Sequence, residues 1–466
     1  MTTTTSEKKA EPRSDRFPPQ IKYIVGNEAC ERFSFYGMRC ILVIFMTSHL
    51  LMKDHEAEAI FHLFVSAVYF TPVVGGWLAD RYWGKYKTIL YISLFYCLGH
   101  GVLAWRDDKP GLYTGLALIA IGAGGIKACV SAFVGDQFSS KQKDLVAKVY
   151  DLFYFSINFG SFFATLLIPV TLKRYGSGVA FGIPGILMAI ATVIFWAGRE
   201  RYVNVPPTKD TGAVGFMPVF FHALTNQSKK KPGQGFFDAA RGKFKDEDVD
   251  AAQAAANVFK VFTTVSVFWS LYDQHSSSWV LQAQSMNREV FGFHLEASQI
   301  AALNPIMVMG MIPLFAYAVY PGVEKLTGIK MTPLKRMGAG MVVAASAFIA
   351  VGLFQVALDR GHAISVAWDI LPFVLITASE IMISITGLEF AYTQAPLSMK
   401  STLMSFWMLT IFAGNLLTAT ISELNVFKGP LYFFFFAGLM AAVSGIFIWT
   451  AARYKTRDYF EDAAKA

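Results

Sequence analysis

The sequence predicts an all-α integral membrane protein in which twelve transmembrane helices form two six-helix bundles. Three observations support this fold class. Of the 466 residues, 54% are hydrophobic and only 16% are charged, whereas a soluble protein has about 25% charged residues. The apolar residues gather in stretches near the length of about 20 residues that a spanning helix needs. One long polar stretch, residues 200–254, divides these stretches into six and six.

Apolar windows bounded by turn residues and charges predict each helix in order along the chain. Each window is long enough to cross a bilayer once. The predicted helices cover residues 20–51, 57–79, 86–105, 112–137, 147–172, 179–199, 255–281, 297–320, 336–358, 368–393, 400–423 and 430–453.

The same division gives five parts of the chain. The polar N-terminal segment lacks the continuous apolar core of a secretory signal, so we expect a flexible tail there. The predicted parts are a cytoplasmic tail at 1–19, an N-terminal bundle at 20–199, a cytoplasmic linker at 200–254, a C-terminal bundle at 255–453 and a cytoplasmic tail at 454–466.

The distribution of positive charge predicts the orientation, because Lys and Arg collect in cytoplasmic loops. With both termini inside, 28 of the 41 Lys and Arg residues fall in inner segments and the adjoining helix ends, and 8 fall in outer loops. Without the long linker the ratio is still 19 to 8. Since the charge follows the predicted membrane borders, we expect a lipid bilayer and not a nucleic acid as the partner. The absence of targeting signals favours a bacterial inner membrane.

No motif indicates a cofactor or a metal. Cys30, Cys40, Cys97 and Cys129 lie within apolar segments and lack CxxC spacing. The glycine-rich run at 122–127 lacks the Ser or Thr that follows the lysine of a phosphate loop, so its small residues are expected to allow close helix packing. We therefore expect no cofactor and no enzymatic activity, and a transport function would have to use an ion gradient.

Eight ionisable residues inside the predicted spans are the strongest functional signal. A charged group at the bilayer centre costs about 3 kcal/mol on insertion scales. Such groups must therefore be paired or line a water-filled cavity. The eight are Glu28, Glu31, Arg32, Arg39, Lys127, Asp273, Glu380 and Glu389.

Helix geometry groups the charges of the first span. Glu28, Glu31 and Arg32 are spaced i, i+3 and i+4, and Arg39 follows seven residues later, so all four share one face. That face is expected to look into the bundle. At a rise of about 1.5 Å per residue, Arg39 reaches the depth of Asp273 near the outer mouth, where the two can pair.

Lys127 and Glu380 lie in the middle-to-inner parts of their helices and can pair across the two halves. A cavity between the halves would offer Arg32 and Lys127 to a carboxylate and Glu380 to an ammonium group, which suits a zwitterion of peptide size. The alternative is that the charges are static pairs that hold helices together. For Glu389 a static structural role and a functional role are equally well supported, because Glu389 lies nine residues from Glu380 and on the opposite face of the helix.

Polar and aromatic groups in the middle of the spans can hydrogen-bond or stack on varied side chains. Individually, each is more typical of a structural position. They are Tyr36, Tyr69, Asn158, Trp269, Asn304 and Trp407. His62, near the outer end of the second span, can titrate near neutral pH, with a purely structural role as the alternative.

Two motifs carry a resemblance to a known family. Residues 28–37 are similar to its signature ExxERFxYYG, and residues 153–161 are similar to FYxxINxGS. The sequence thus resembles the proton-dependent oligopeptide transporter family of the major facilitator superfamily, and the loop 75–85 resembles the superfamily's loop between helices two and three. The resemblance implies two six-helix bundles that rock about a central site and carry di- and tripeptides inward with protons.

The resemblance also implies roles in substrate binding. Arg32 and Lys127 would take the peptide carboxylate, and Glu380 would take the amino terminus. Asn158 and Asn304 would hold the peptide backbone. The side-chain pockets would be formed by Tyr36, Tyr69, Trp269 and Trp407.

The resemblance implies a second set of roles in proton coupling and gating. Glu28 and Glu31 match the coupling carboxylates, and His62 matches a histidine implicated in coupling in animal members. The proton-coupling group as a whole would be Glu28, Glu31, Arg32, Glu380 and His62. The gating salt bridges would be Arg39 with Asp273 on the outer side and Lys127 with Glu380 on the inner side.

The sequence departs from the family pattern at two positions. Phe35 replaces the first tyrosine of the YYG motif, and Ala128 replaces the proline usual after GGIK, so side-chain preference and the bend of the fourth helix can differ. The alternatives are a carrier of nitrate or amino acids with the same fold, or a non-transporting sensor or channel. The acidic Glu380 opposite basic residues favours a zwitterion. We expect the protein to act as a monomer.

Overall fold

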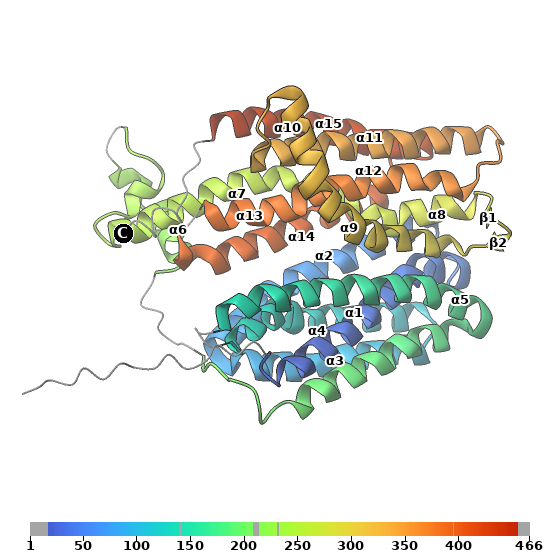
Figure 1. The fold of residues 1–466 in the computed structure, drawn as a ribbon, viewed down its shortest axis with the longest axis horizontal. Helices are drawn as coiled ribbons and strands as arrows, with labels where there is room; N and C mark the ends of the chain where they lie inside the picture. The colour runs from blue at the N-terminus through green and yellow to red at the C-terminus, as the bar shows by residue number, and fades with distance from the viewer. Residues whose placement is uncertain (1–16, 139–141, 208–213, 231–232, 395, 455–466) are drawn as a thin grey trace, which may run out of the picture.

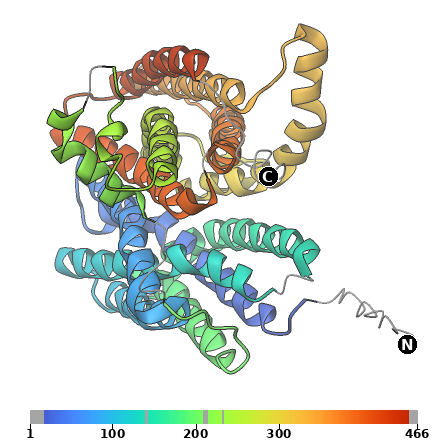
Figure 2. The same cartoon turned by 90° about the vertical axis from the view of Figure 1, so that its left-hand side faces the viewer.

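The structure is a computed structural model that describes residues 17–138, 142–207, 214–230, 233–394 and 396–454. Its long helices run roughly parallel in two bundles, which separate clearly in the end-on view (Figures 1 and 2). Each bundle has its own apolar core: one built almost wholly from residues before 203, the other from residues after 215. Most of both predicted terminal tails lies outside the described residues.

The described part of the N-terminal bundle contains five α-helices and two π-turns. They are α1 (Ile21–Ile44) with the π-turn η1 (Phe45–His49), α2 (Asp54–Leu78) with the π-turn η2 (Ala79–Trp83), α3 (Gly84–Trp105), α4 (Lys109–Asp136) and α5 (Lys143–Ala197).

The fifth and sixth predicted spans both lie in α5, which reverses direction at Gly176 (Figure 1). Gly176 has φ 81° and ψ 178°, a conformation that costs glycine little because it lacks Cβ. The two arms of α5 therefore form an antiparallel pair, as the sequence predicted for 147–172 and 179–199.

The linker contains more structure than its polar composition predicted. It includes α6 (Phe216–Thr225) and the 3₁₀ turns η4 (Gln227–Lys229) and η5 (Phe237–Ala240). Helix α7 (Asp246–Tyr272) begins nine residues before the predicted boundary at 255. Acidic residues in its first turn interact favourably with the positive end of the helix dipole. The acidic residues that suggested a loop here therefore belong to the start of a helix.

The C-terminal bundle continues from α7 through shorter elements. These are η6 (Asp273–Ser276), α8 (Ser278–Gln284), the hairpin β1 (Glu289–Val290) and β2 (Phe293–His294), η7 (Ala297–Ala302), α9 (Leu303–Leu314), η8 (Phe315–Val319), α10 (Tyr320–Thr327), α11 (Pro333–Asp359), η9 (Val366–Asp369), α12 (Ile370–Glu380), η10 (Ile381–Ile385), α13 (Thr386–Thr393), η11 (Leu397–Met399), α14 (Lys400–Leu424) and α15 (Pro430–Arg453). Glu289 and Val290 pair with His294 and Phe293 in antiparallel register.

The prediction of one continuous helix over 255–281 was wrong. The chain leaves helical geometry at Ser277, with φ −129° and ψ −93°, between the 3₁₀ turn η6 and α8. The tenth predicted helix is also modified, because the π-turn η10 follows Glu380 directly. Such irregular turns commonly mark functional positions in helices.

Nine helical stretches in the described part of the chain are long and apolar enough to cross a membrane. Two of them, Asp54–Trp105 and Lys148–Ala197, contain two predicted spans each. The nine stretches therefore correspond to eleven of the twelve predicted spans. The remaining span is α1, which carries five charged residues in 24. The fold class is confirmed, and the count of twelve rests partly on the prediction for α1.

Close packing of small residues fixes the N-terminal bundle, as predicted for the run at 122–127. A Cβ added at Gly75 of α2 would lie 2.3 Å from the carbonyl oxygen of Gly124 in α4, so the two backbones are in direct contact. The helix pair α9 and α10 has a different character and stands at the margin of the C-terminal bundle (Figure 2). Only 17% of the apolar window over Ala297–Thr327 is buried within the protein.

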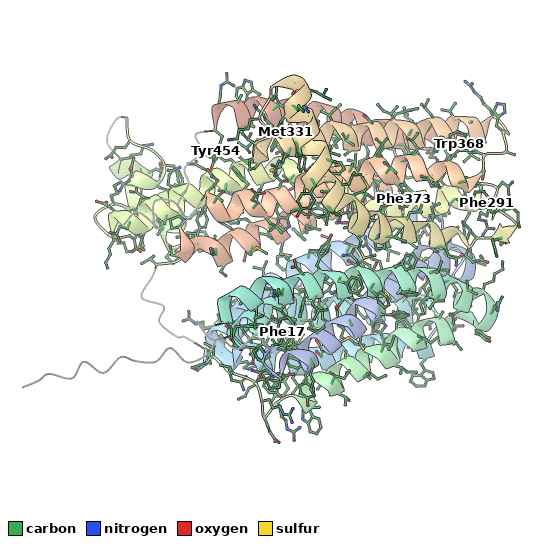
Figure 3. The ribbon with its side chains drawn as sticks, in the orientation of Figure 1. Phe17, Phe291, Met331, Trp368, Phe373 and Tyr454 are labelled. Carbon is green, nitrogen blue, oxygen red and sulfur yellow. The ribbon has the colours of Figure 1, made fainter. Side chains whose placement is uncertain are left out.

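We call the side with the hairpin the outer side, following the predicted orientation. Phe291, at the tip of the hairpin, marks this end in Figure 3, whereas Phe17 and Tyr454 lie toward the opposite end. Phe373 lies within the C-terminal bundle and is fully buried.

Candidate functional site

A cavity of about 280 Å³ lies between the two bundles. Its walls come from α1, α2 and α5 on one side and from α7, η6, η7, α9, α12, η10 and α14 on the other. Its volume is close to the lower end of the range of about 300–1,000 Å³ typical of small-molecule sites. Seven of the nine predicted binding residues line it: Tyr36, Tyr69, Asn158, Trp269, Asn304, Glu380 and Trp407.

Glu380 forms the acidic end of the cavity. Asn304 donates from Nδ2 to its Oε2 at 2.9 Å, and the Tyr272 hydroxyl donates to Oδ1 of Asn304 at 3.3 Å. Within the described part of the chain, no Lys or Arg lies within the 4.0 Å ion-pair distance of Glu380. The predicted pair with Lys127 is therefore not formed in this conformation.

Lys127 lies instead over two aromatic rings, behind the wall of the cavity. Its Nζ is 4.5 Å from the ring centroid of Phe35 and 5.2 Å from that of Tyr69. These are cation–π distances. Tyr69 lines the cavity while Lys127 does not, so the ammonium group contacts a lining residue without lining the cavity itself.

Arg32 is held by the two glutamates of its own helix. Its Nε donates to Oε1 of Glu28 at 2.7 Å and lies 2.9 Å from Oε2 of Glu31. The second contact is an ion pair without hydrogen-bond geometry. Tyr96 of α3 donates to Oε1 of Glu31 at 3.2 Å. With Glu31 fully buried and Arg32 8% exposed, these contacts occupy the guanidinium and keep it out of the cavity lining.

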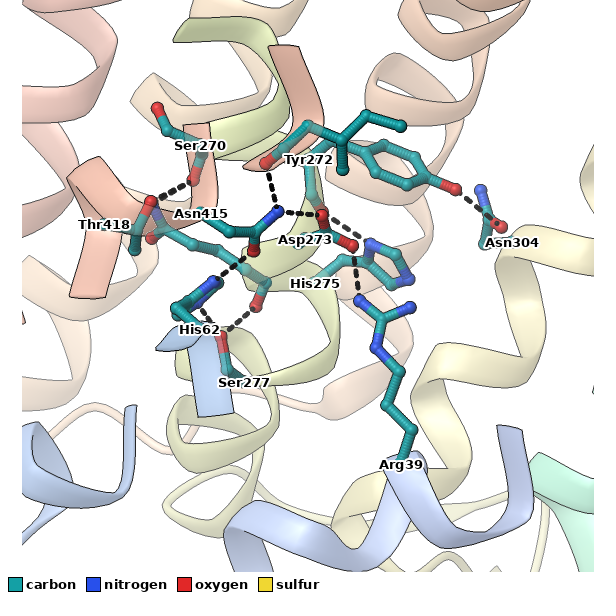
Figure 4. Close-up of polar contacts among 12 residues, drawn as sticks. Arg39, His62, Ser270, Tyr272, Asp273, His275, Ser277, Asn304, Asn415 and Thr418 are labelled. Atoms are coloured by element: carbon teal, nitrogen blue, oxygen red, sulfur yellow. Dashed lines mark hydrogen bonds and ion pairs between the residues drawn. The ribbon is translucent and has the colours of Figure 1, made fainter. Parts of the chain in front are cut away.

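The predicted outer pair is present. Arg39 and Asp273 form a buried ion pair between α1 and η6 (Figure 4). Asn415 of α14 donates from Nδ2 to the other carboxylate oxygen of Asp273 at 2.7 Å. The guanidinium also lies 5.3 Å from the ring centroid of Phe61. Both bundles are therefore joined at the outer end of the cavity.

His62 belongs to the same polar chain. Because Asn415 donates to Asp273, its Oδ1 accepts from Nδ1 of His62 at 2.8 Å, which leaves Nε2 facing the Ser277 hydroxyl at 2.8 Å (Figure 4). His62 is fully buried. The ring can bind a second proton in place, since the Ser277 oxygen can accept as well as donate.

Glu389 lies apart from this site. Its side chain is 54% exposed, 3.9 Å from Arg336, and it does not line the central cavity. Of the two alternatives left open by the sequence, this position supports the static one.

Several lining residues were missed by sequence reasoning. Tyr154 lies inside the FYxxINxGS motif, and Tyr272 and His275 flank Asp273. Asn415 is a polar residue in an apolar window, which was a usable signal. Nothing in the sequence indicated that Asn415 would bridge His62 and Asp273, since that contact joins residues from three helical segments.

Comparison with known proteins identifies the family to which the chain belongs. A family model described as "POT family" matches residues 86–428. The chain belongs to the POT family. This POT family chain is 27% identical to "Peptide transporter 3" of Caenorhabditis elegans, over 96% of this chain and 94% of that protein. It is 38% identical to "Peptide transporter family 1" of Drosophila melanogaster, over 71% of this chain and 47% of that protein.

A solved structure of an auto-inhibited POT family peptide transporter shares the fold. It is 41% identical to this POT family chain, with a TM-score of 0.87 over 95% of this chain and 98% of that one. Because the matched proteins are transporters, the chain is a membrane transporter and not an enzyme. It spans about half the length of the Drosophila protein.

Proposed function

We propose that the protein imports di- and tripeptides together with protons by alternating access. Glu380 carries this proposal, because it is a carboxylate in the cavity wall with an amide partner at 2.9 Å and no cation beside it among the described residues. A buried carboxylate without a counter-ion is costly. The ammonium group of a peptide would supply the missing charge, and the names of the related peptide transporters point to the same class of substrate.

The peptide carboxylate is proposed to bind Arg32 and Lys127, which lie just behind the cavity wall. Arg32 is occupied by Glu28 and Glu31 at 2.7 and 2.9 Å. A proton on either glutamate removes one negative charge from this cluster and weakens its hold on the guanidinium. Arg32 is then free to bind the carboxylate, so the arrival of a proton favours the arrival of a peptide.

The remaining walls suit varied side chains. Trp269 and Trp407 meet at 87° with ring centroids 5.9 Å apart, and Tyr36 and Tyr69 line the cavity with them. The buried Nε1 of Trp269 has no hydrogen-bond partner in the described part of the chain, so it is available to a peptide carbonyl. We propose that these four rings form the side-chain pockets.

Asn158 and Asn304 are proposed to hold the peptide backbone. Asn158 at present donates to the Tyr154 carbonyl of its own helix at 2.9 Å, and its Oδ1 can accept a peptide N–H. Asn304 joins the backbone site to the acidic end through Glu380.

The two predicted salt bridges are proposed to alternate. The Arg39–Asp273 pair closes the outer side in this conformation, while Lys127 and Glu380 are apart. When the inner side closes, Lys127 would leave the rings of Phe35 and Tyr69 and pair with Glu380. His62, together with Glu28 and Glu31, is proposed to carry protons between the two states.

We further propose that the protein acts as a monomer in a bacterial inner membrane with both termini in the cytoplasm. The excess of Lys and Arg in the segments on the side of the termini supports this orientation. Protease accessibility of tags placed on both termini in sealed vesicles tests it.

Uptake of labelled dialanine into proteoliposomes, with and without an inward proton gradient, tests the main proposal. We expect accumulation against the peptide gradient only when the outside is more acidic. Glu28→Gln and Glu31→Gln should each abolish proton-driven accumulation and retain exchange of internal for external peptide. Accumulation that survives in both variants would falsify the coupling role.

Glu380→Gln provides the test of the ammonium site, with Glu389→Gln as its matched control on the same predicted span. We expect the first to weaken dialanine uptake strongly and the second to leave it unchanged. Competition by excess nitrate or alanine separates the alternative substrates. Uptake that nitrate or alanine suppresses more effectively than dialanine would support the other carriers instead.

A further inference from the structure

A polar seam joins α2 of one bundle to α14 of the other on the outer half of the protein. Three residues of α2, spaced four apart, each contact α14. Ser66 donates to the Phe412 carbonyl at 2.9 Å, His62 bonds Asn415 at 2.8 Å, and Glu58 accepts from Ser422 at 3.3 Å. Because the helices run antiparallel, the pairs follow in order from the middle of the membrane to the outer end.

Glu58 is the unexplained member of this seam. It is 9% exposed, does not line the central cavity, and was not singled out by sequence reasoning because it lies near a helix end. Its partner Ser422 also bonds the Tyr432 hydroxyl of α15 at 3.0 Å. The neighbours that the structure places around this carboxyl group are therefore hydroxyl groups.

The charged and titratable groups that face Glu58 do not neutralise it. Asp54, one turn earlier on α2, is another acid, and Tyr432 faces it from α15. His62, one turn later, is engaged by Asn415 and Ser277. Within the described part of the chain, no Lys, Arg or His forms an ion pair with Glu58.

An ionised carboxylate in such a setting is unfavourable, because desolvation is not offset by a cation. A protonated carboxyl group is neutral and can act as both donor and acceptor among the hydroxyls. The closed seam therefore favours the protonated form of Glu58. When the bundles separate at this end, water reaches the side chain and the carboxylate ionises as it does in solution.

We propose that Glu58 is a proton-binding site whose occupancy from the outer solution stabilises closure of the outer side. The proposal rests on the alternating access proposed above. The direction follows from linkage: the closed state holds one more proton than the open state, so lowering the outer pH favours closure and raising it favours opening. One linked proton changes the ratio of closed to open by at most about tenfold per pH unit.

This role differs from that of the coupling glutamates. Glu58 lies in the outer half of the seam, so its proton enters and leaves on the same side and is not carried across. Its replacement should therefore change how outer pH controls closure without changing the number of protons transported per peptide. Glu28 and Glu31, in contrast, lie on the face of α1 beside the cavity and are proposed to affect that number.

Distances between spin labels on the two bundles test the proposal directly. Leu51 and Phe291 are 83% and 97% exposed at the outer end, and labels on cysteines placed there report the opening. As the pH rises from about 5 to about 8, we expect the ratio of closed to open protein to fall in the wild type. Glu58→Gln should make this fall less steep, by up to tenfold per pH unit. Glu56→Gln, on the same helical turn, is the matched control and should behave like the wild type.

Infrared difference spectra provide a second measurement. The closed wild-type protein near neutral pH should show the carbonyl band of a protonated carboxyl group that is absent from Glu58→Gln. Glu58→Met, which also lacks a titrating group, should reproduce both effects if the glutamine variant folds poorly. An unchanged pH dependence of the distances, or the same carbonyl band in wild type and variants, would overturn the proposal.

Failure of this proposal can be told apart from failure of the proposed function. The distance and infrared measurements use no peptide, whereas the proposed function stands or falls on proton-driven dialanine uptake by the wild type. If the wild type accumulates dialanine but Glu58→Gln keeps the normal pH dependence of closure, only the role of Glu58 is wrong.

Discussion

Replacing Arg39 with glutamine should shift the protein toward the outward-open state by a large factor. The Arg39–Asp273 ion pair is buried, with side chains 8% and 5% exposed. In Arg39→Gln, Asp273 keeps its bond from Asn415 at 2.7 Å but loses the guanidinium. Removing one partner of a buried ion pair costs about 3–5 kcal/mol. Because this cost falls on the outer-closed state, the ratio of open to closed should rise by about two to almost four orders of magnitude.

Cys40 provides a native reporter for this shift. It follows Arg39 directly, lines the central cavity and is 5% exposed in the outer-closed conformation. With the other three cysteines, Cys30, Cys97 and Cys129, replaced by alanine, labelling by a membrane-impermeant thiol reagent added from outside reports the open population. We expect labelling of Arg39→Gln to be faster by at least about a hundredfold, until the open state predominates.

A double-mutant cycle distinguishes the ion pair from a general effect on packing. Asp273→Asn leaves Arg39 as an unpaired buried cation, so it too should favour opening. The double variant, Arg39→Gln with Asp273→Asn, has two neutral amides that can bond each other. Its effect on the free energy of opening should therefore be smaller than the sum of the two single effects, by about 0.5–3 kcal/mol. Arg106→Gln is the control, since its outer pair with Asp108 at 2.6 Å is about half exposed and is therefore screened by solvent. Strictly additive effects, or unchanged labelling in both single variants, would refute the reasoning.

Three further predictions concern the binding site, the packing and the linker. Glu380→Gln should weaken dialanine binding by at least about tenfold, because it removes a charged hydrogen-bond partner worth about 1.5–3 kcal/mol; equilibrium binding measures this. Gly124→Ala should lower the thermal midpoint, since the new Cβ would lie 2.7 Å from the Cβ of its α2 neighbour, whereas Gly101→Ala meets nothing within 4 Å and should be neutral. Arg241 lowers the pKa of Asp238 through a side-chain hydrogen bond, so this contact is present above the ordinary carboxyl pKa and is lost as pH falls through the lowered value. In Arg241→Ala, acid-induced hydrogen exchange at residues 235–241 should begin at higher pH.

Most helix positions could be predicted because membrane insertion demands long apolar windows and alternating loop charges. The predicted helix boundaries were wrong where polar residues break a helix within a span or begin a helix outside it. Residues 273–278 read Asp-Gln-His-Ser-Ser-Ser, six polar residues that a continuous spanning helix would not favour. They mark the break after α7, where backbone groups released from the helix are satisfied locally. The early start of α7 was hidden for the opposite reason, because its acidic first turn resembled a loop.

The sequence predicted those site residues whose charge is unfavourable inside an apolar span. Charges inside apolar spans are recognisable one at a time, so Arg39, Asp273 and Glu380 could be found from the sequence. Their partners depend on distances between helices, which composition does not encode. The position of Lys127 over Phe35 and Tyr69 therefore could not be foreseen.

The break after α7 connects the acidic end of the cavity to the outer closure. Tyr272 and Asp273 are consecutive, yet the first bonds Asn304, the partner of Glu380, and the second pairs with Arg39 and Asn415. A regular helix would place these two side chains about 100° apart on a rigid rod. Because α7 ends at Tyr272 and the 3₁₀ turn η6 begins at Asp273, the acidic end of the cavity and the outer pair are held by consecutive residues at this junction. The ammonium site proposed at Glu380 and the outer pair therefore share a structural element, through which the two can be thermodynamically coupled.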